Sequence, residues 1–262
     1  MAILNMIDPL YVLSGLAVGF IVGMTGVGGG SLMTPLLVLL FGIHPATAVG
    51  TDLLYAAATK ATGTAVHGWN RTVDWRIAGK LAAGSVPAAV ATLLAMRTYG
   101  MQSQGGSTLI STLLGAALLL TALSLVFRAR LMAFSARHAP ISPAMQSVLT
   151  IVTGGVLGVL VSVSSVGAGA LGVTALIILY PRIPVARIVG TDIAHAVPLT
   201  LVAGLGHWLL GSVDWHILGS LLVGSLPGIV MGSATAPRVP EGVLRPMLAC
   251  VLVVVGVRLI WR

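Results

Sequence analysis

Gly50-Thr51-Asp52 returns in the second half of the chain as Gly190-Thr191-Asp192. Two further matches keep the same spacing, namely Val73-Asp74-Trp75 with Val213-Asp214-Trp215 and Gly84-Ser85-Val86-Pro87 with Gly224-Ser225-Leu226-Pro227. These repeats hold four of the six acidic residues in the chain. A duplicated unit made almost entirely of apolar residues is typical of membrane transporters.

The composition indicates that lipid is the main solvent of this chain of 262 residues. It is 57% hydrophobic and only 8% charged, whereas a soluble domain carries roughly 25% charged residues. The net charge of +8 could suggest nucleic acid, but the basic residues lie in short gaps between apolar runs, as in membrane proteins. No basic stripe with interleaved aromatic residues is present, so we exclude nucleic-acid binding.

The apolar segments predict an all-α, polytopic membrane bundle. They lie at about 10–24, 31–42, 47–66, 75–96 and 108–127, and again at about 145–163, 170–180, 187–206, 215–236 and 243–260. The first two segments of each set are shorter than the roughly 20 residues of a full crossing, and a glycine-rich break joins them. We therefore expect each half to contain a re-entrant pair of half-helices and three spanning helices.

We expect the chain to divide into three parts that follow the repeat. These are a first transmembrane repeat at 1–127, a basic cytoplasmic linker at 128–143 and a second transmembrane repeat at 144–262. With these hairpins, one side of the membrane receives nine arginines: Arg71, Arg76, Arg128, Arg130, Arg137, Arg182, Arg187, Arg238 and Arg245. The other side receives Arg97, Arg258 and Arg262. Basic loops face the cytoplasm, so the nine-arginine side is expected there. Two complete short crossings would give the same split and stay an alternative.

An odd number of crossings in each half makes the two halves inverted, so matched loops should face opposite compartments. Their charges differ accordingly. The loop with Arg71 and Arg76 matches the loop at 207–214, which has no lysine or arginine. Divergence of loop charge beside a retained core motif is expected of an inverted duplication.

The two glycine-rich breaks are the predicted substrate site. The first contains Thr25, Gly28, Gly29, Gly30 and Ser31, and the second contains Ser162, Ser164, Ser165, Gly167 and Gly169. Glycine lets a ligand approach the main chain, and a half-helix that starts there presents free N–H groups and a positive dipole end. Two such ends would hold a small oxyanion. The alternative is close helix packing through glycine.

The buried acids and one lysine are the predicted coupling or charge-balancing groups. Asp52 and Asp192 either sit in the first turn of a helix, where an acid suits the dipole, or bind an ion or a proton. His195 follows Asp192 by one turn and could form a proton-handling pair with it. Lys60 lies two turns after Asp52 and could neutralise a substrate or pair with Asp52.

Other polar residues have structural interpretations. Asp74 and Asp214 precede tryptophans at helix starts, so we expect N-caps at the membrane interface. His67 and His207 lie near the ends of spans, where an interfacial position is expected.

The chain resembles the TauE/SafE family of sulfite exporters over nearly its whole length. The resemblance is carried by Gly19 to Pro35, Gly50 to Lys60, Gly158 to Gly169 and Gly190 to Pro198. It implies a multi-pass protein of the bacterial inner membrane, linked to export or uptake of sulfite, sulfonates and other small organic anions. Many members have an uncharged small residue where this chain has Asp52 and Asp192.

We therefore expect a secondary transporter for sulfite, a sulfonate or a related sulfur-containing anion, working by alternating access. We expect it to have no enzymatic activity, no cofactor and no bound metal. A gradient of H⁺, Na⁺ or substrate would drive it, and the sequence is compatible with a homo-oligomer. One alternative is a divalent-cation transporter that uses Asp52, Asp192 and His195. Another is a membrane-embedded enzyme built on Asp192 and His195, for which a nucleophile and a metal-ligand set are missing.

Overall fold

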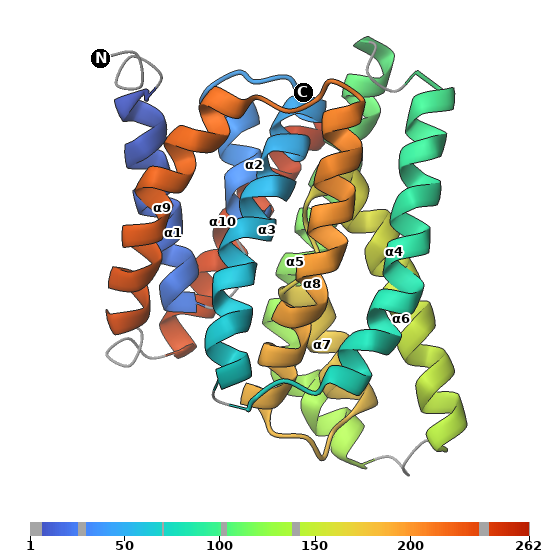
Figure 1. Cartoon of the computed structure of the whole chain (residues 1–262). Coiled ribbons are helices and arrows are strands. Elements are labelled where there is room, and N and C mark those ends of the chain that lie inside the picture. Colours follow the sequence, from blue (N-terminus) through green and yellow to red (C-terminus); the bar gives the residue numbers. More distant parts are fainter. Residues whose placement is uncertain are drawn as a thin grey trace.

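The computed structural model describes residues 7–25, 30–69, 71–100, 104–137, 142–235 and 241–261. These residues form ten α-helices (Figure 1). Those of the first half are α1 (Pro9–Thr25), α2 (Gly30–Leu39), α3 (Pro45–Trp69), α4 (Trp75–Thr98) and α5 (Gln104–Arg137). Those of the second half are α6 (Pro143–Ser164), α7 (Ala170–Leu179), α8 (Val185–Leu209), α9 (Trp215–Thr235) and α10 (Glu241–Ile260).

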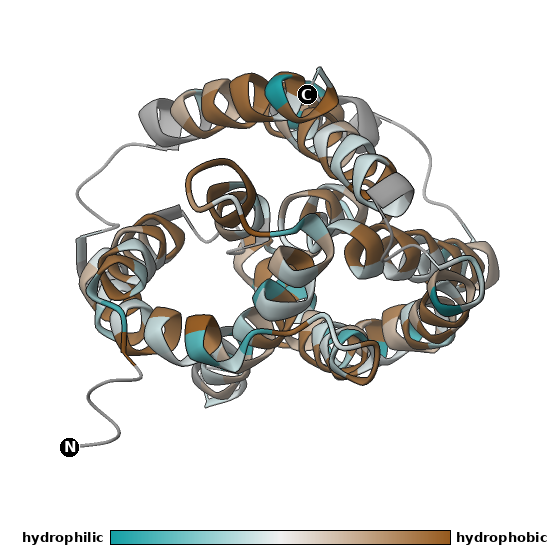
Figure 2. Ribbon diagram, turned by 90° about the horizontal axis from the view of Figure 1, so that it is seen from above, coloured by the Kyte–Doolittle hydropathy of each residue, from teal (hydrophilic) through white to brown (hydrophobic). Residues whose placement is uncertain are grey.

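The exterior of the bundle is apolar. Within the described residues, helices long and apolar enough to cross a membrane lie at Trp75–Thr98, Gly106–Arg128, Pro143–Ser164, Val185–Leu209 and Trp215–Gly232. Many large apolar side chains are exposed, among them Leu94, Val230 and Val254, and hydrophobic residues are spread over all the helices (Figure 2). Such an apolar surface is suited to contact with lipid. Helices are also suited to lipid, because each one satisfies its own backbone hydrogen bonds where no water is present.

The helix lengths correct two expectations. The short helices α2 and α7 have 10 residues each, as the half-helix interpretation requires. Their partner α6 has 22 residues and is long enough to cross by itself, so the expectation of two half-helices is wrong there. The Ser142 hydroxyl caps α6 and Pro143 occupies its first turn, which starts the helix early. In addition, α5 continues to Arg137, so residues 128–137 of the expected linker are helical.

The two halves exchange helices: α1 packs against α9, and α6 packs against α4. Glycines make both contacts. A Cβ placed on Gly15 would lie 2.3 Å from the carbonyl oxygen of Leu221, and one on Gly154 would lie 2.1 Å from that of Leu81. No side chain fits at either position, so the backbones approach as closely as small-residue packing allows.

The long helices α3 and α8 pack together at the centre, and two matched hydrogen bonds join them to the starts of α9 and α4. The backbone N–H of Asp214 donates to Thr51 Oγ1 at 3.0 Å, and that of Asp74 donates to Thr191 Oγ1 at 2.9 Å. Each threonine therefore stabilises the N-terminus of another helix. The expected N-caps are confirmed, since both aspartate side chains accept backbone N–H groups in the first turn of the helix that follows them.

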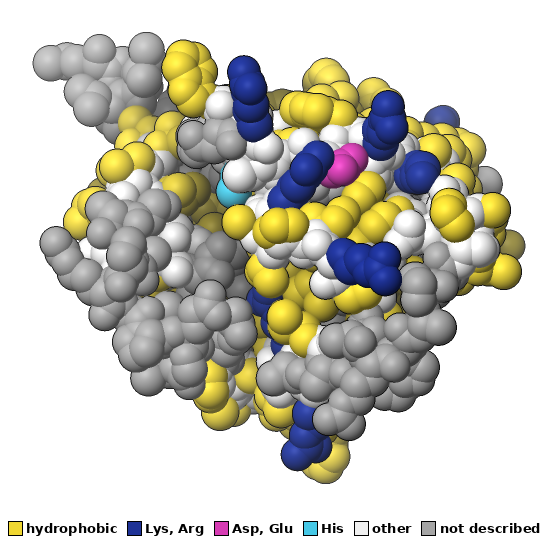
Figure 3. Space-filling view, turned by 90° about the horizontal axis from the view of Figure 1, so that it is seen from below, with side chains coloured by type: hydrophobic (Ala, Val, Ile, Leu, Met, Phe, Trp, Pro, Cys, Tyr) yellow, Lys and Arg dark blue, Asp and Glu magenta, His cyan; other side chains and the backbone are white. Residues whose placement is uncertain are grey.

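The ends of the two short pairs lie on opposite faces. Helix α1 begins and α2 ends at the upper end of the bundle in Figure 1, whereas α6 begins and α7 ends at the lower end. Lysine and arginine side chains gather on the lower face (Figure 3). Exposed Arg71, Arg76, Arg182 and Arg187 belong to the loops and first turns that lead into α4 and α8 there.

Candidate functional site

The break between α6 and α7 is a buried turn whose backbone conformation depends on its small residues. Ser165 follows the last residue of α6 with φ 57°, and its N–H donates to the carbonyl of Val161. Gly167 and Gly169 have φ of 123° and 129°, values at which a side chain would be strained. The Ser164 hydroxyl serves this turn, because it donates to Leu160 O at 2.7 Å and accepts the N–H of Val166.

Two other hydroxyls of this break are available to a ligand. Ser162 is 0% exposed and Ser165 is 5% exposed. Among the residues that the structure describes, Ser162 Oγ has no hydrogen-bond partner, and Ser165 Oγ forms no geometrically complete bond although it lies near enough to act on the Asp52 carboxyl. Because a buried hydroxyl without a partner is unfavourable, these two are candidate ligand-binding groups.

Lys60 extends from α3 to the same break. Its Nζ donates to the carbonyl oxygen of Ala168 at 3.1 Å. The expected direct ion pair with Asp52 is not formed: the ion pair found in the described part of the chain joins Arg187 and Asp74. The charge of Lys60 nevertheless acts on both Asp52 and Asp192. The amino group of Lys60 thus lies at the second glycine break, within electrostatic reach of two acids.

Asp52 connects three elements at the centre of the bundle. It is fully buried, about two turns inside α3. Thr34 of α2 donates its hydroxyl to Asp52 Oδ2, and the Ser165 side chain of the second break acts on the same carboxyl. Its Oδ1 has no bonding partner within the described ranges. The helix-start interpretation is wrong, since α3 begins at Pro45.

Asp192 occupies the matching position in α8 and has different surroundings. It is also fully buried and well inside its helix. Neither carboxyl oxygen has a hydrogen-bond partner in the described part of the chain. The carboxyl group faces α7, where a Cβ on Gly172 would lie 1.9 Å from Oδ1, and the backbone N–H of Gly169 acts on it. Gly172 therefore makes the room that this side chain needs.

The histidines of α8 have partners other than those expected. His195 Nε2 lies 2.9 Å from the hydroxyl of Ser85 on α4, so the expected Asp192–His195 pair is not formed. His207 is buried, and its Nε2 lies 2.9 Å from the carbonyl oxygen of Ser162. The interfacial expectation is wrong for His207, which instead supports the second break.

The first break is only partly described. Thr25 ends α1 and Gly30 begins α2, and Ser31 is buried in the first turn of α2. Gly28 and Gly29 lie outside the described residues. Their expected role in substrate binding stays a prediction.

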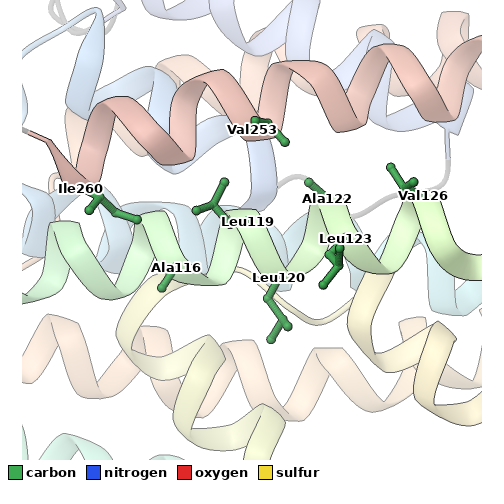
Figure 4. Close-up of a pocket in the computed structure, with 8 residues that line it drawn as sticks. All are labelled: Ala116, Leu119, Leu120, Ala122, Leu123, Val126, Val253 and Ile260. Atoms are coloured by element: carbon green, nitrogen blue, oxygen red, sulfur yellow. The ribbon is translucent and has the colours of Figure 1, made fainter.

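An outer groove of about 540 Å³ between α5 and α10 has a different character (Figure 4). Its lining is entirely apolar: Ala116, Leu119, Leu120, Ala122, Leu123, Val126, Val253 and Ile260. It offers no donor to an anion, so the polar groups around the second break, and not this groove, are the candidate site.

Comparison with known proteins identifies the family. The family model described as "Sulfite exporter TauE/SafE" matches residues 11–259. The chain belongs to the TauE/SafE family. As a member of this family it is a multi-pass membrane transporter, and its apolar helices agree with that assignment.

Two relatives cover nearly all of the chain. The "Probable membrane transporter protein YjnA" of Bacillus subtilis is 39% identical over 95% of this chain and 98% of its own length. A "Probable membrane transporter protein" of Xylella fastidiosa is 30% identical over 95% of this chain and 93% of its own length. No solved structure matches the chain.

Several residues around this TauE/SafE centre were not among the predicted site residues: Thr34, Tyr55, Ser85, Gly172 and Ser225. A signal existed for Ser85 and Ser225, which form part of the repeated Gly-Ser-x-Pro motif. No comparable signal marks Thr34 or Gly172, because each lies in an apolar run and is brought to its aspartate by the fold.

Proposed function

We propose that this TauE/SafE transporter moves a small sulfur-containing anion, most suitably sulfite or a sulfonate, across the bacterial inner membrane by alternating access. The anion binds at the second glycine break, beside Lys60, and at the first break opposite it. The observation that carries this proposal is the hydrogen bond from Lys60 Nζ to Ala168 O, because it puts a positive charge at a break lined by unpartnered hydroxyls.

The chemistry of the second break suits an oxyanion. Ser162 and Ser165 have hydroxyl groups that can donate, and Lys60 supplies a charged donor. The N-terminus of α7 begins at Ala170, directly after Gly169. Free N–H groups and the positive end of the helix dipole favour an anion there. A sulfite or sulfonate group has three oxygens to accept these bonds.

The matched contacts support two inverted halves. The pairing of α1 with α9 corresponds to that of α6 with α4, and the Asp214–Thr51 bond corresponds to the Asp74–Thr191 bond. In transporters of this kind, one half rocks against the other around a central site. The pairs α1–α2 and α6–α7 are then inverted relative to each other, and their 10-residue members α2 and α7 return toward opposite sides. The arginine-rich lower face and the linker are cytoplasmic by the charge rule.

Asp52 and Asp192 are proposed to couple transport to an ion gradient. A carboxyl group with an unpartnered oxygen inside a membrane protein is a place where a proton or a cation is taken up. The charge of Lys60 acts on both acids, so uptake of H⁺ or Na⁺ there would compensate the charge of an entering anion. His195, one turn after Asp192, belongs to the same group of proposed coupling residues and is hydrogen-bonded to Ser85.

Flux of sulfite into proteoliposomes tests the proposal, with Lys60→Met as the variant and Lys80→Met as its matched control. Lys80 is also a half-buried lysine on a long helix, and its Nζ donates to Ser147 Oγ at 2.7 Å, away from the breaks. Loss of a charged hydrogen bond should raise the half-saturating sulfite concentration at least ~10-fold in Lys60→Met, with little change in Lys80→Met.

Equal effects of the two substitutions would contradict a substrate role for Lys60. Flux of no sulfur oxyanion by the unmodified protein would reject the substrate class. The divalent-cation alternative then gains support if metal-ion flux is present and is lost in Asp52→Asn. An enzyme built on Asp192 and His195 is not proposed, because His195 is bonded to Ser85 instead.

A further inference from the structure

Two hydrogen bonds at the centre of the bundle occur in one half and not in the other. Several contacts come in matched pairs, one in each half, as with Gly50 against Ser212 O and Gly190 against Thr72 O. Where both halves hold polar side chains at the matched positions but only one half forms the bond, the difference records how the halves differ in the present conformation. Two such exceptions involve Asp52, Asp192 or the residue one turn after them.

The first exception is the bond between the short helix and the long helix of each half. Thr34 of α2 donates to Asp52 of α3. Thr174 stands at the matching place on α7 and is buried. Asp192 has no hydrogen-bond partner among the described residues. The α2–α3 bond is thus formed, and its α7–α8 counterpart is open.

The second exception runs in the opposite sense. His195 of α8 is bonded to Ser85 of α4 at 2.9 Å. The matching residues are Tyr55 of α3 and Ser225 of α9. The Ser225 side chain acts on the Tyr55 hydroxyl, and both are buried, yet neither hydroxyl has a hydrogen-bond partner in the part of the chain that is described. Here the contact of the second half is formed, and that of the first half is open.

We propose that these four contacts are two alternative bonding sets of the transport cycle. In the present state Thr34–Asp52 and His195–Ser85 are formed. In the state open to the other side Thr174–Asp192 and Tyr55–Ser225 are formed instead. Tyr55, Ser85, Thr174 and Ser225 are then positioning residues of the transporter. The inference rests on the proposed alternating access of inverted halves and is independent of the substrate.

The exchange follows from the symmetry of the chain. When two inverted halves exchange conformations, each adopts the contacts that its counterpart had before. Both open pairs hold buried polar groups on helices that already pack together, α7 with α8 and α3 with α9, and pairing is favoured for such groups. Each set leaves a carboxyl group of one half unpartnered, so neither set satisfies all the groups at once.

The test measures the populations of the two states with paired spin labels in the full chain. Cys250→Ser removes the single native cysteine. One label pair replaces exposed His44 and Leu209, at the upper ends of α3 and α8, and the other replaces their exposed counterparts Pro184 and Trp69, at the lower ends of α8 and α3. An exchange of conformations should give the upper pair the distance of the lower pair, and the reverse.

Variants of the two sets should shift these populations in opposite directions. Thr34→Val and Ser85→Ala each remove a bond of the present state and should favour the other state about 2- to 10-fold. Thr174→Val and Ser225→Ala should favour the present state by a similar factor. Thr121→Val is the control, because the bond that the described residues give this buried hydroxyl is to Ala117 O of its own helix.

Shifts of opposite sign, with none in Thr121→Val, would support the inference. Shifts of one sign, or none, would overturn it even if sulfite is transported. Opposite shifts in a protein that transports no sulfur oxyanion would overturn the proposed substrate alone. If Ser225→Ala fails to fold, Tyr55→Phe removes the same bond and takes its place.

Discussion

Replacing Gly84 with alanine should separate α4 from α6. A Cβ at this position would lie 1.9 Å from the carbonyl oxygen of Ile151 and 2.8 Å from the nitrogen of Gly155. Ordinary contact begins at 3.4 Å, so the two helices must move apart locally to admit the methyl group. Both nearest atoms are backbone and cannot rotate away. Overpacking of this kind costs about 1–3 kcal/mol.

Gly79 on the same helix is the matched control, because a Cβ there would meet nothing within 4 Å. Alanine is favoured over glycine in a helix interior by about 1 kcal/mol. This gain applies to both variants. Gly79→Ala should therefore be neutral or stabilising, and the two variants should differ by the overpacking cost of about 1–3 kcal/mol in the free energy of unfolding. Unfolding of the purified protein in mild detergent, followed by tryptophan fluorescence, measures this difference.

The same comparison can be made on α9. Gly224 would place a Cβ 1.9 Å from the carbonyl oxygen of Val12, whereas Gly219 has open space. If Gly84→Ala and Gly224→Ala are as stable as their controls, the close approach of the exchanged helices is not a source of stability, and the packing argument fails.

Three further predictions concern the ends of the helices. Asp214→Ala should lower the free energy of unfolding by about 1 kcal/mol, because Oδ1 of Asp214 accepts the N–H groups of His216 and Ile217. Asp214→Asn should keep most of this stability, and an equal loss of stability in both variants would argue against a cap. Arg187→Gln should cost no more than about 1 kcal/mol, since its bond to Asp74 is largely exposed; a larger loss of thermal stability would show a role beyond this pair. Single cysteines labelled from outside the cell should react at position 210 and not at position 72, and the reverse pattern would invert the proposed topology.

The sequence predicts most of the fold because apolar runs and helix caps are local signals. Every predicted apolar segment corresponds to a helix, and the caps at Asp74 and Asp214 follow from one acid before a tryptophan. The breaks are visible as clusters of glycine and serine. Such features depend on neighbouring residues only, so they can be read without knowing which helices pack together.

The site is less predictable because its contacts join distant segments. The sequence allows Asp52 to lie in the first turn of a helix, but in the structure α3 already begins at Pro45. His195 has an acid one turn before it, yet its partner Ser85 lies 110 residues away. Lys60 reaches Ala168 across 108 residues. No local pattern encodes these pairings, which arise from the exchange of helices between the halves.

That exchange also sets an order for assembly in the membrane. Helix α6 meets its partner α4 soon after synthesis, because only α5 lies between them. Helix α1 must wait for α9, since its Gly15 packs on the backbone of Leu221. Contacts between such distant segments form late. The first helix to enter the bilayer is therefore among the last to reach its final packing. A chain whose synthesis stops before α9 leaves α1 without its main packing partner.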